Sequence, residues 1–330
     1  AHGRGAGDPQ RGRGVAVSGR WRLWLASVLG MVVVAAGLLA FEGRTATRPW
    51  EDGYLPNPLL TTQHGERIRF HDLIRGRAVA VNTFFTVCTD VCPLGTAKLL
   101  ELQRQLGERV GRDIVFLSIS VDPAHDTPAA MQAYAAQYGA GPGWYFLTGQ
   151  EAEVAQLVRR LGLGSIGPTS PRDAHTSTLR VGHEPSGQWM KTSSTDNPLY
   201  VAETVRTFLG WPRTDAAPDY RQARALQITS GEYLFRNGCA ACHSIGEGDR
   251  LGPDLRDVGQ RRDRVWLERF VSAPDAMLDA GDPVAQALLA RYKGVRMPNL
   301  GLAPDEVREI LGYIEARSAR LGGREHAGGH

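Results

Sequence analysis

The chain has 330 residues, of which 42% are hydrophobic and 22% charged, and its formal net charge is +3. One hydrophobic core seldom serves more than about 250–300 residues, so this length predicts two or three domains. The composition is typical of globular protein, and the small net charge argues against nucleic acid as a partner.

Residues 1–22 predict a basic tail, because they contain five arginines and a single aspartate. Residues 23–41 hold no charged side chain and as a helix would span roughly 28 Å, close to the thickness of a bilayer core. More arginines precede this stretch than follow it closely, which places the N-terminus in the cytoplasm. We therefore expect a single-pass anchor in a bacterial inner membrane, with the following domains in the periplasm. The alternative is a cleaved signal peptide, which would export the same domains.

Residues 42–57 predict a linker, and residues 58–212 predict an α/β domain. Apolar runs rich in β-branched and aromatic residues indicate strands, and apolar positions at helical spacing indicate helices. The expected strands are 68–70, 78–85, 113–121, 144–147, 178–181 and 188–190, and the expected helices are 94–110, 128–138, 151–161 and 201–209. This alternation is typical of one mixed central sheet with helices packed on it.

The remaining residues change character. Residues 213–224 are polar and predict a second linker, and residues 225–317 predict an all-α domain without strands. Its helical stretches are expected at 226–238, 262–272 and 304–317. Residues 318–330 are expected to form a flexible tail.

The four cysteines fall into two pairs, and the second stands in Cys239-Ala-Ala-Cys242-His243. This spacing is the attachment signal of c-type haem, in which two thioethers hold the porphyrin and the histidine binds the iron. A redox dithiol and half of a zinc site are the alternatives. No second cysteine pair lies nearby to complete a zinc site, and Met297 stands in Arg-Met-Pro just before the last helical stretch.

Together these features resemble a class I cytochrome c over residues 225–317. The resemblance implies Cys239 and Cys242 as thioether positions, His243 as the proximal ligand and Met297 as the distal ligand. Met277 is the rival for the distal position, but it lacks the Met-Pro setting. A His/Met pair raises the potential of haem iron, which suits electron transfer.

The first cysteine pair, Cys88 and Cys92, follows an apolar strand-like run and precedes a helical run. Cysteines at the start of a helix after a strand form a thioredoxin-like arrangement, in which the helix dipole lowers the thiol pKa. The spacing i, i+4 places both sulfur atoms on one helical face, with room for a soft ion such as Cu(I). A redox disulfide and a structural disulfide remain alternatives.

Four separated motifs then resemble the Sco/SenC copper-chaperone family over about residues 58–210. They are Phe84-Phe-Thr-x-Cys88-x-x-x-Cys92-Pro, Ser118-Ile-Ser-Val-Asp122-Pro with Asp126-Thr-Pro, Trp144-x-x-Leu-Thr-Gly, and His175 before Thr-Ser-Thr. The resemblance implies a thioredoxin-like fold and copper bound by Cys88, Cys92 and His175. It also implies delivery of copper to the binuclear copper centre of cytochrome oxidase, or reduction of the cysteines there.

The surroundings of the histidine depart from this family in one respect. The family has aspartate directly before the histidine, where this chain has Ala174, and the nearest aspartate is Asp173. The hydrogen-bond partner of His175 is therefore open. His125 is also available, but the family needs no histidine at that position, and we expect no metal role for it.

The sequence thus favours a membrane-anchored copper metallochaperone whose c-type haem domain exchanges electrons with the copper site. Haem iron and copper are one-electron couples, whereas a disulfide needs two electrons at a potential of roughly −120 to −300 mV. The expected partners are a copper-bearing oxidase subunit or similar recipient, other electron-transfer proteins, and the membrane. One alternative is a periplasmic thiol–disulfide oxidoreductase that uses Cys88 and Cys92 as its catalytic pair. The other is a membrane-anchored electron carrier.

Overall fold

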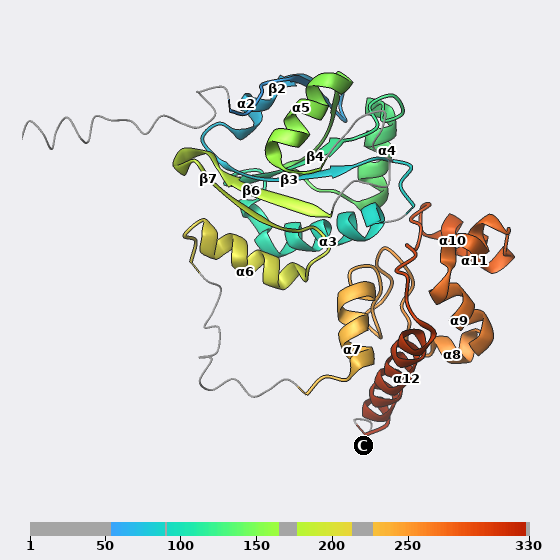
Figure 1. The fold of residues 1–330 in the computed structure, drawn as a ribbon. Coiled ribbons are helices and arrows are strands. Elements are labelled where there is room, and N and C mark those ends of the chain that lie inside the picture. Colours follow the sequence, from blue (N-terminus) through green and yellow to red (C-terminus); the bar gives the residue numbers. More distant parts are fainter. Residues whose placement is uncertain (1–53, 90, 165–176, 213–226, 328–330) are drawn as a thin grey trace, which may run out of the picture. The chain divides into compact units, whose positions relative to one another are not determined.

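The computed structural model describes residues 54–89, 91–164, 177–212 and 227–327 (Figure 1). An α/β region comes first in the chain and a helical region follows it, as the sequence predicts. The predicted anchor at 23–41, the basic tail before it, most of the first predicted linker and all of the second lie outside the described residues. Among the described helices, none has the length and the hydropathy needed to cross a bilayer.

The α/β region is built on a seven-stranded sheet with the order β2-β1-β5-β4-β3-β6-β7. Its strands are β1 (Leu59–Thr62), β2 (Arg67–Arg69), β3 (Ala78–Phe84), β4 (Ile114–Ser120), β5 (Trp144–Gly149), β6 (Thr178–His183) and β7 (Gln188–Ser193). β3, β4 and β5 are parallel, and the other pairs are antiparallel. The predicted mixed sheet is therefore confirmed, although β1 was not expected.

Every residue of β3 and β4 is buried, because both faces of these strands are covered. One face packs against α3 (Val91–Leu106), α4 (Pro128–Tyr138) and α6 (Pro198–Phe208). The other face packs against α2 (Phe70–Ile74) and α5 (Glu151–Leu161). Phe70 was expected at the end of a strand, but it begins α2 and is fully buried.

The helical region consists of short helices and one long C-terminal helix (Figure 1). These are α7 (Ser230–Leu234), which continues as a π-helical turn Phe235–Cys239, then α8 (Val258–Arg261), α9 (Arg264–Ser272), α10 (Pro274–Asp279), α11 (Pro283–Arg291) and α12 (Pro304–Ala327). Helices in the three predicted stretches are present, whereas α8, α10 and α11 were not expected.

α7 and α12 cross at very short range. A Cβ atom on Gly231 would lie 2.1 Å from the carbonyl oxygen of Glu309, so only glycine permits this approach. α12 also corrects one prediction, because residues 318–327 are helical rather than a flexible tail. Ser318 is buried and its hydroxyl accepts a hydrogen bond from the amide of Asp257, which anchors the extra turns.

Candidate functional site

The first cysteine pair lies where β3 ends and α3 begins. Cys88 is in the connection between them, and Cys92 is in the first turn of α3. Both residues are buried, with 6% of their surface exposed. The neighbouring Val87 is 58% exposed, so this connection reaches the surface beside the buried Cys88. The predicted arrangement of strand, cysteine pair and helix is therefore present.

A buried carboxylate joins this connection to the end of β4. Asp126 is 0% exposed, and its Oδ1 atom accepts hydrogen bonds from the amide of Thr86 at 2.9 Å and its hydroxyl at 2.6 Å. Its Oδ2 atom accepts from the hydroxyl of Ser120 at 2.5 Å. The hydroxyl oxygen of Ser120 in turn accepts from the amide of Asp122 at 3.0 Å. The segments that follow two parallel strands are thus tied together through buried polar contacts.

Only two of the three predicted copper ligands, Cys88 and Cys92, lie in the part of the chain that the structure describes. His175, like Asp173 and Ala174, lies outside the described residues. Within the described residues, no group of three or more His, Cys, Asp or Glu side chains is placed to hold a metal ion. The ligand set of Cys88, Cys92 and His175 therefore stays a prediction. The donor types fit a soft copper ion, since thiolate sulfur and imidazole nitrogen both bind copper well.

His125 lies in the segment after β4. Its Nδ1 atom donates a hydrogen bond to Oδ1 of Asp122 at 2.8 Å, and its side chain is 57% exposed. This contact accounts for the ring orientation through a local i, i+3 pair and does not require a metal.

An aromatic cluster supports the sheet face under α3 and α4. The hydroxyls of Thr96, one turn after Cys92, and Tyr134 are 2.9 Å apart. The rings of Phe84, Tyr134 and Phe146 are within 5.8 Å of one another, measured between centroids. Burial raises the pKa of Tyr134 well above its ordinary value, so its hydroxyl stays protonated. The start of α3 therefore rests on a rigid, largely apolar base.

The second cysteine pair lines an apolar pocket in the helical region. Cys239, Cys242, His243 and Met297 all contribute to its wall. The apolar wall also includes Leu251, Leu267, Phe270, Leu278, Leu288, Leu289, Val295, Ile310, Leu311 and Ile314. A pocket with two thiols, an imidazole, a thioether and apolar walls fits a covalently attached haem.

The imidazole of His243 is held in one tautomer. Its Nδ1 atom is 2.9 Å from the carbonyl oxygen of Pro253, so Nδ1 carries the proton and Nε2 keeps its lone pair. Burial lowers the pKa of His243 and favours the neutral ring. A Cβ atom on Gly252 would lie 2.5 Å from Cε1 of His243, so the ring can pack on this backbone only because residue 252 is glycine.

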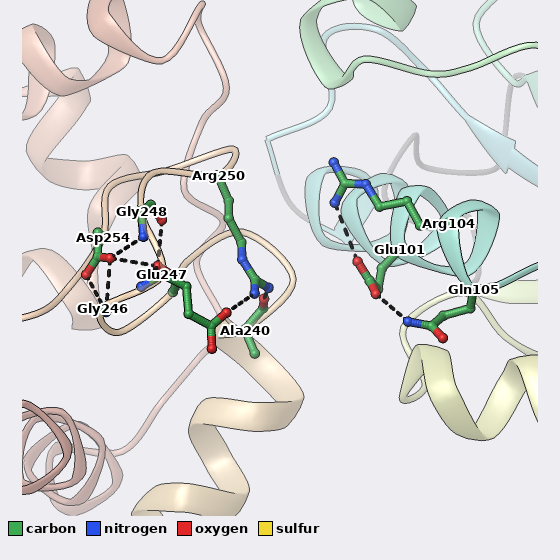
Figure 2. Close-up of polar contacts among 10 residues, drawn as sticks. Glu101, Arg104, Gln105, Ala240, Gly246, Glu247, Gly248, Arg250 and Asp254 are labelled. Atoms are coloured by element: carbon green, nitrogen blue, oxygen red, sulfur yellow. Dashed lines mark hydrogen bonds and ion pairs between the residues drawn. The ribbon is translucent and has the colours of Figure 1, made fainter. Parts of the chain in front are cut away.

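Figure 2 shows polar contacts of Gly246, Gly248, Arg250 and Asp254 in the loop that follows the haem-attachment motif. The Asp254 carboxylate accepts hydrogen bonds from the amides of Gly246, Gly248 and Arg256 and from the hydroxyl of Ser244. Although burial acts in the opposite direction, these backbone donors lower the pKa of Asp254 to about 2.

Arg250 of the same loop reaches back to the haem-attachment motif. Its Nη1 atom donates to the carbonyl oxygen of Ala240 at 3.0 Å, and its Nη2 atom pairs with Glu247 at 2.6 Å (Figure 2). The loop is thus anchored to the residues between the two cysteines.

Met297 lies in the segment between α11 and α12. Asn299, two residues later, donates to Oδ1 of Asp275 at 3.0 Å, and the hydroxyl of Tyr292, five residues earlier, donates to Asp249 at 2.7 Å. Met277, the rival ligand, is 5% exposed in α10 and does not line the pocket. The structure thus brings Met297, and not Met277, to the same pocket as His243.

Sequence reasoning missed the partners that hold these groups in place. Asp126 was noted only as part of a motif, and Asp254 was given no structural role. The available signal was the pattern of Ser120, Asp122 and Asp126. A small polar residue ends an otherwise largely apolar strand, and two acidic residues lie in the segment after it.

Comparisons with known proteins agree with both regions. Residues 57–180 match the family model described as SCO1/SenC, and residues 228–318 match the one described as Cytochrome c. The resemblances to the Sco/SenC and cytochrome c families are therefore confirmed. The matches also support the predicted cofactors, copper and haem c.

Curated relatives match over the first region. The mitochondrial protein SCO2 homolog of Bos taurus is 38% identical over 97 residues, which cover 29% of this chain and 36% of that protein. The SCO1 protein homolog of Bacillus subtilis (strain 168) is 35% identical over 99 residues, covering 29% and 50%. The chain thus spans a half or less of the length of these relatives. A SCO1/SenC family lipoprotein from Bacillus anthracis str. Ames aligns in structure with a TM-score of 0.42 and 22% identity, over 47% of this chain and 94% of that one.

Proposed function

We propose that this chain, which carries a SCO1/SenC domain followed by a cytochrome c domain, is a membrane-anchored copper chaperone for a cytochrome oxidase. Its cargo is copper, and its recipient is the copper-bearing subunit of the oxidase or a similar copper protein. The observation that supports this role best is the position of Cys88 and Cys92 between β3 and α3. Thiolates there are stabilised by the helix dipole and are soft ligands that favour Cu(I).

In this proposal Cys88, Cys92 and His175 hold the copper ion. Asp126 and Thr86 keep the connection that bears Cys88 in place. Ligands of the recipient then replace these donors one at a time, so that the ion is never released into solution.

In the second domain, Cys239 and Cys242 would hold haem c through two thioether bonds. His243 would provide Nε2 and Met297 its sulfur as ligands, while the Pro253 carbonyl accepts the hydrogen bond from Nδ1. The attached haem supplies a one-electron couple. The apolar side chains of the pocket exclude water around it.

The haem would supply a one-electron couple that matches the Cu(II)/Cu(I) couple in stoichiometry, and electron exchange between the two sites is part of this proposal. Rapid mixing tests this step in the full chain with the haem reduced. Addition of Cu(II) should oxidise the haem in the wild type but not in the Cys88→Ser, Cys92→Ser double variant, which keeps the haem ligands. Equal oxidation in both proteins, or none in the wild type, would refute the exchange.

The chaperone role itself is tested by copper transfer. Copper-loaded chain is mixed with the soluble copper domain of an oxidase subunit, and the copper content of each protein is measured after separation. Transfer should depend on Cys88, Cys92 and His175. Failure of the wild type to bind copper would exclude this role.

A thiol–disulfide oxidoreductase is the second candidate, because the Cys88 and Cys92 thiols at the start of a helix suit disulfide exchange as well. His175→Ala separates the two roles. In a chaperone it abolishes copper transfer, whereas a dithiol reductase keeps its activity towards a disulfide substrate. A simple electron carrier would need neither cysteine of this pair.

The anchor at residues 23–41 belongs to the same proposal. Replacing it by a cleavable signal peptide should move the chain from the membrane fraction to the soluble periplasmic fraction. Retention in the membrane after this exchange would show that another part of the chain holds it there.

A further inference from the structure

The connection between β3 and α3 contains a turn that ends in Cys88. The amide of Cys88 donates to the carbonyl oxygen of Phe85 at 3.2 Å, so Thr86 and Val87 are the two central residues of this turn. Asp126 accepts both the amide and the hydroxyl of Thr86 through one oxygen atom. The Asp126 carboxylate therefore holds the turn at Thr86, two positions before Cys88.

The same carboxylate is anchored on the opposite side. Its second oxygen accepts from the hydroxyl of Ser120, the last residue of β4. β3 and β4 are paired in parallel up to Phe84 and Ser120, and the amide of Val121 donates to the carbonyl oxygen of Phe84 at 2.9 Å. Asp126 thus spans two strands at the edge of the sheet where their carboxyl ends meet.

Asp126 does not cap the N-terminus of α4, the helix that follows it. The N-cap of α4 is Thr127, whose hydroxyl accepts from the amide of Ala130 at 3.2 Å. All three donors to Asp126 are neutral groups, namely one amide and two hydroxyls. Placing a carboxylate in a fully buried position opposite neutral donors costs desolvation free energy. Apolar packing would stabilise the fold as well, so stability alone does not explain a carboxylate at position 126.

We propose that Asp126 is the positioning residue of the copper site, which acts through Thr86 to fix Cys88 relative to Cys92. The copper measurements that test this inference rest on the proposed function. The position of Cys88 relative to Cys92 can be tested without copper. Residues that hold metal ligands in place typically change metal affinity by about 10- to 100-fold when they are lost. Losses in this range are expected here.

The sharpest variant is Thr86→Val, because it keeps the shape and the backbone amide of residue 86 and removes only the hydroxyl donor. Thr86→Ser is its matched control, since it keeps that donor. Asp126→Ala removes both contacts to residue 86, whereas Asp126→Asn keeps an oxygen that can accept them. We expect copper affinity to be highest in the wild type, Thr86→Ser and Asp126→Asn, lower in Thr86→Val and lowest in Asp126→Ala.

Two measurements on the full chain report this order. The first is the affinity for Cu(I) and the absorption spectrum of the Cu(II)-loaded site, with haem absorbance as the internal measure of chain concentration. Thr86→Val should lower the affinity about tenfold and shift the thiolate-to-copper band, and Thr86→Ser should do neither. The second is the rate of alkylation of Cys88 in the copper-free chain, which should change severalfold in Thr86→Val and in Asp126→Ala but not in Thr86→Ser.

The outcomes separate this inference from the proposed function. If the wild type binds no copper, the chaperone role fails, and the alkylation rates still test the position of Cys88. If Thr86→Val and Asp126→Ala fold, as judged by circular dichroism, and keep the wild-type spectrum, affinity and alkylation rate, the positioning role is wrong. A misfolded Asp126→Ala leaves the decision to the isosteric Thr86→Val.

Discussion

The Nδ1 atom of His243 lies 2.9 Å from the carbonyl oxygen of Pro253, which can only accept a hydrogen bond. This contact places the proton on Nδ1 and leaves the lone pair of Nε2 available as a ligand. It depends on the adjacent Gly252, whose missing side chain leaves space for the imidazole.

Gly252→Ala should therefore disturb the haem site. Its Cβ atom would lie 2.5 Å from Cε1 of His243, and the ring or the loop must move. Overpacking of this kind costs about 1–3 kcal/mol. We expect a lower haem content per chain and a lower unfolding temperature. Gly312→Ala is the control, because no atom lies within 4 Å of its added Cβ and alanine favours a helix by up to about 1 kcal/mol. Equal haem content in both variants would contradict the prediction.

Asp254 should make the stability of the cytochrome region depend on acid pH. Its pKa is about 2 in the folded chain and 3.8 ordinarily, so the folded state favours the ionised form. The stability that ionised Asp254 contributes is fully present above its ordinary pKa. This stability is lost as the pH falls from there through the pKa of the folded state.

Asp254→Asn tests this dependence. The variant should unfold at a lower temperature than the wild type at pH 7, and the difference should narrow between about pH 5 and about pH 2. Thermal unfolding followed by haem absorbance measures both proteins. A difference that is the same at every pH would mean that the charge of Asp254 is not the cause.

Met297 and Met277 should behave differently when replaced. Met297→Ala removes the thioether that lines the pocket with His243, so the haem stays attached while its reduction potential falls. Met277→Leu conserves volume in a buried position of α10 and should cost less than about 1.5 kcal/mol with the potential unchanged. Redox titration distinguishes them, and a fall in potential only in the Met277 variant would reassign the ligand.

The histidines of the first domain give a further test. His175→Ala should lower copper affinity by about 10-fold or more, because it removes a predicted ligand. His125→Ala should leave the affinity unchanged, since its ring is held by Asp122 through a local contact. Equilibrium competition with a Cu(I) chelator measures both. Loss of copper in the His125 variant alone would place the third ligand after β4.

Much of the chemistry could be predicted from the sequence because it depends on local spacing. The intervals Cys88 to Cys92 and Cys239 to His243 place their side chains within one or two turns of chain, whatever surrounds them. The apolar runs of β3 and β4 likewise predict buried parallel strands, since both faces of such strands must be covered. Met297 was preferred over Met277 on its flanking proline, and the structure brings it to the pocket.

Only the tertiary structure determined what holds these groups in place. Asp126 and Thr86 are 40 positions apart and meet because β3 and β4 are neighbours with a shared carboxyl edge. Gly231 and Glu309 meet only where α7 crosses α12. A buried polar or close contact is satisfied by whichever partner the packing brings near, and the local sequence does not contain that information. The motifs thus predict candidate ligands, and the packing of distant segments positions the cysteines, His243 and Met297 among the described residues.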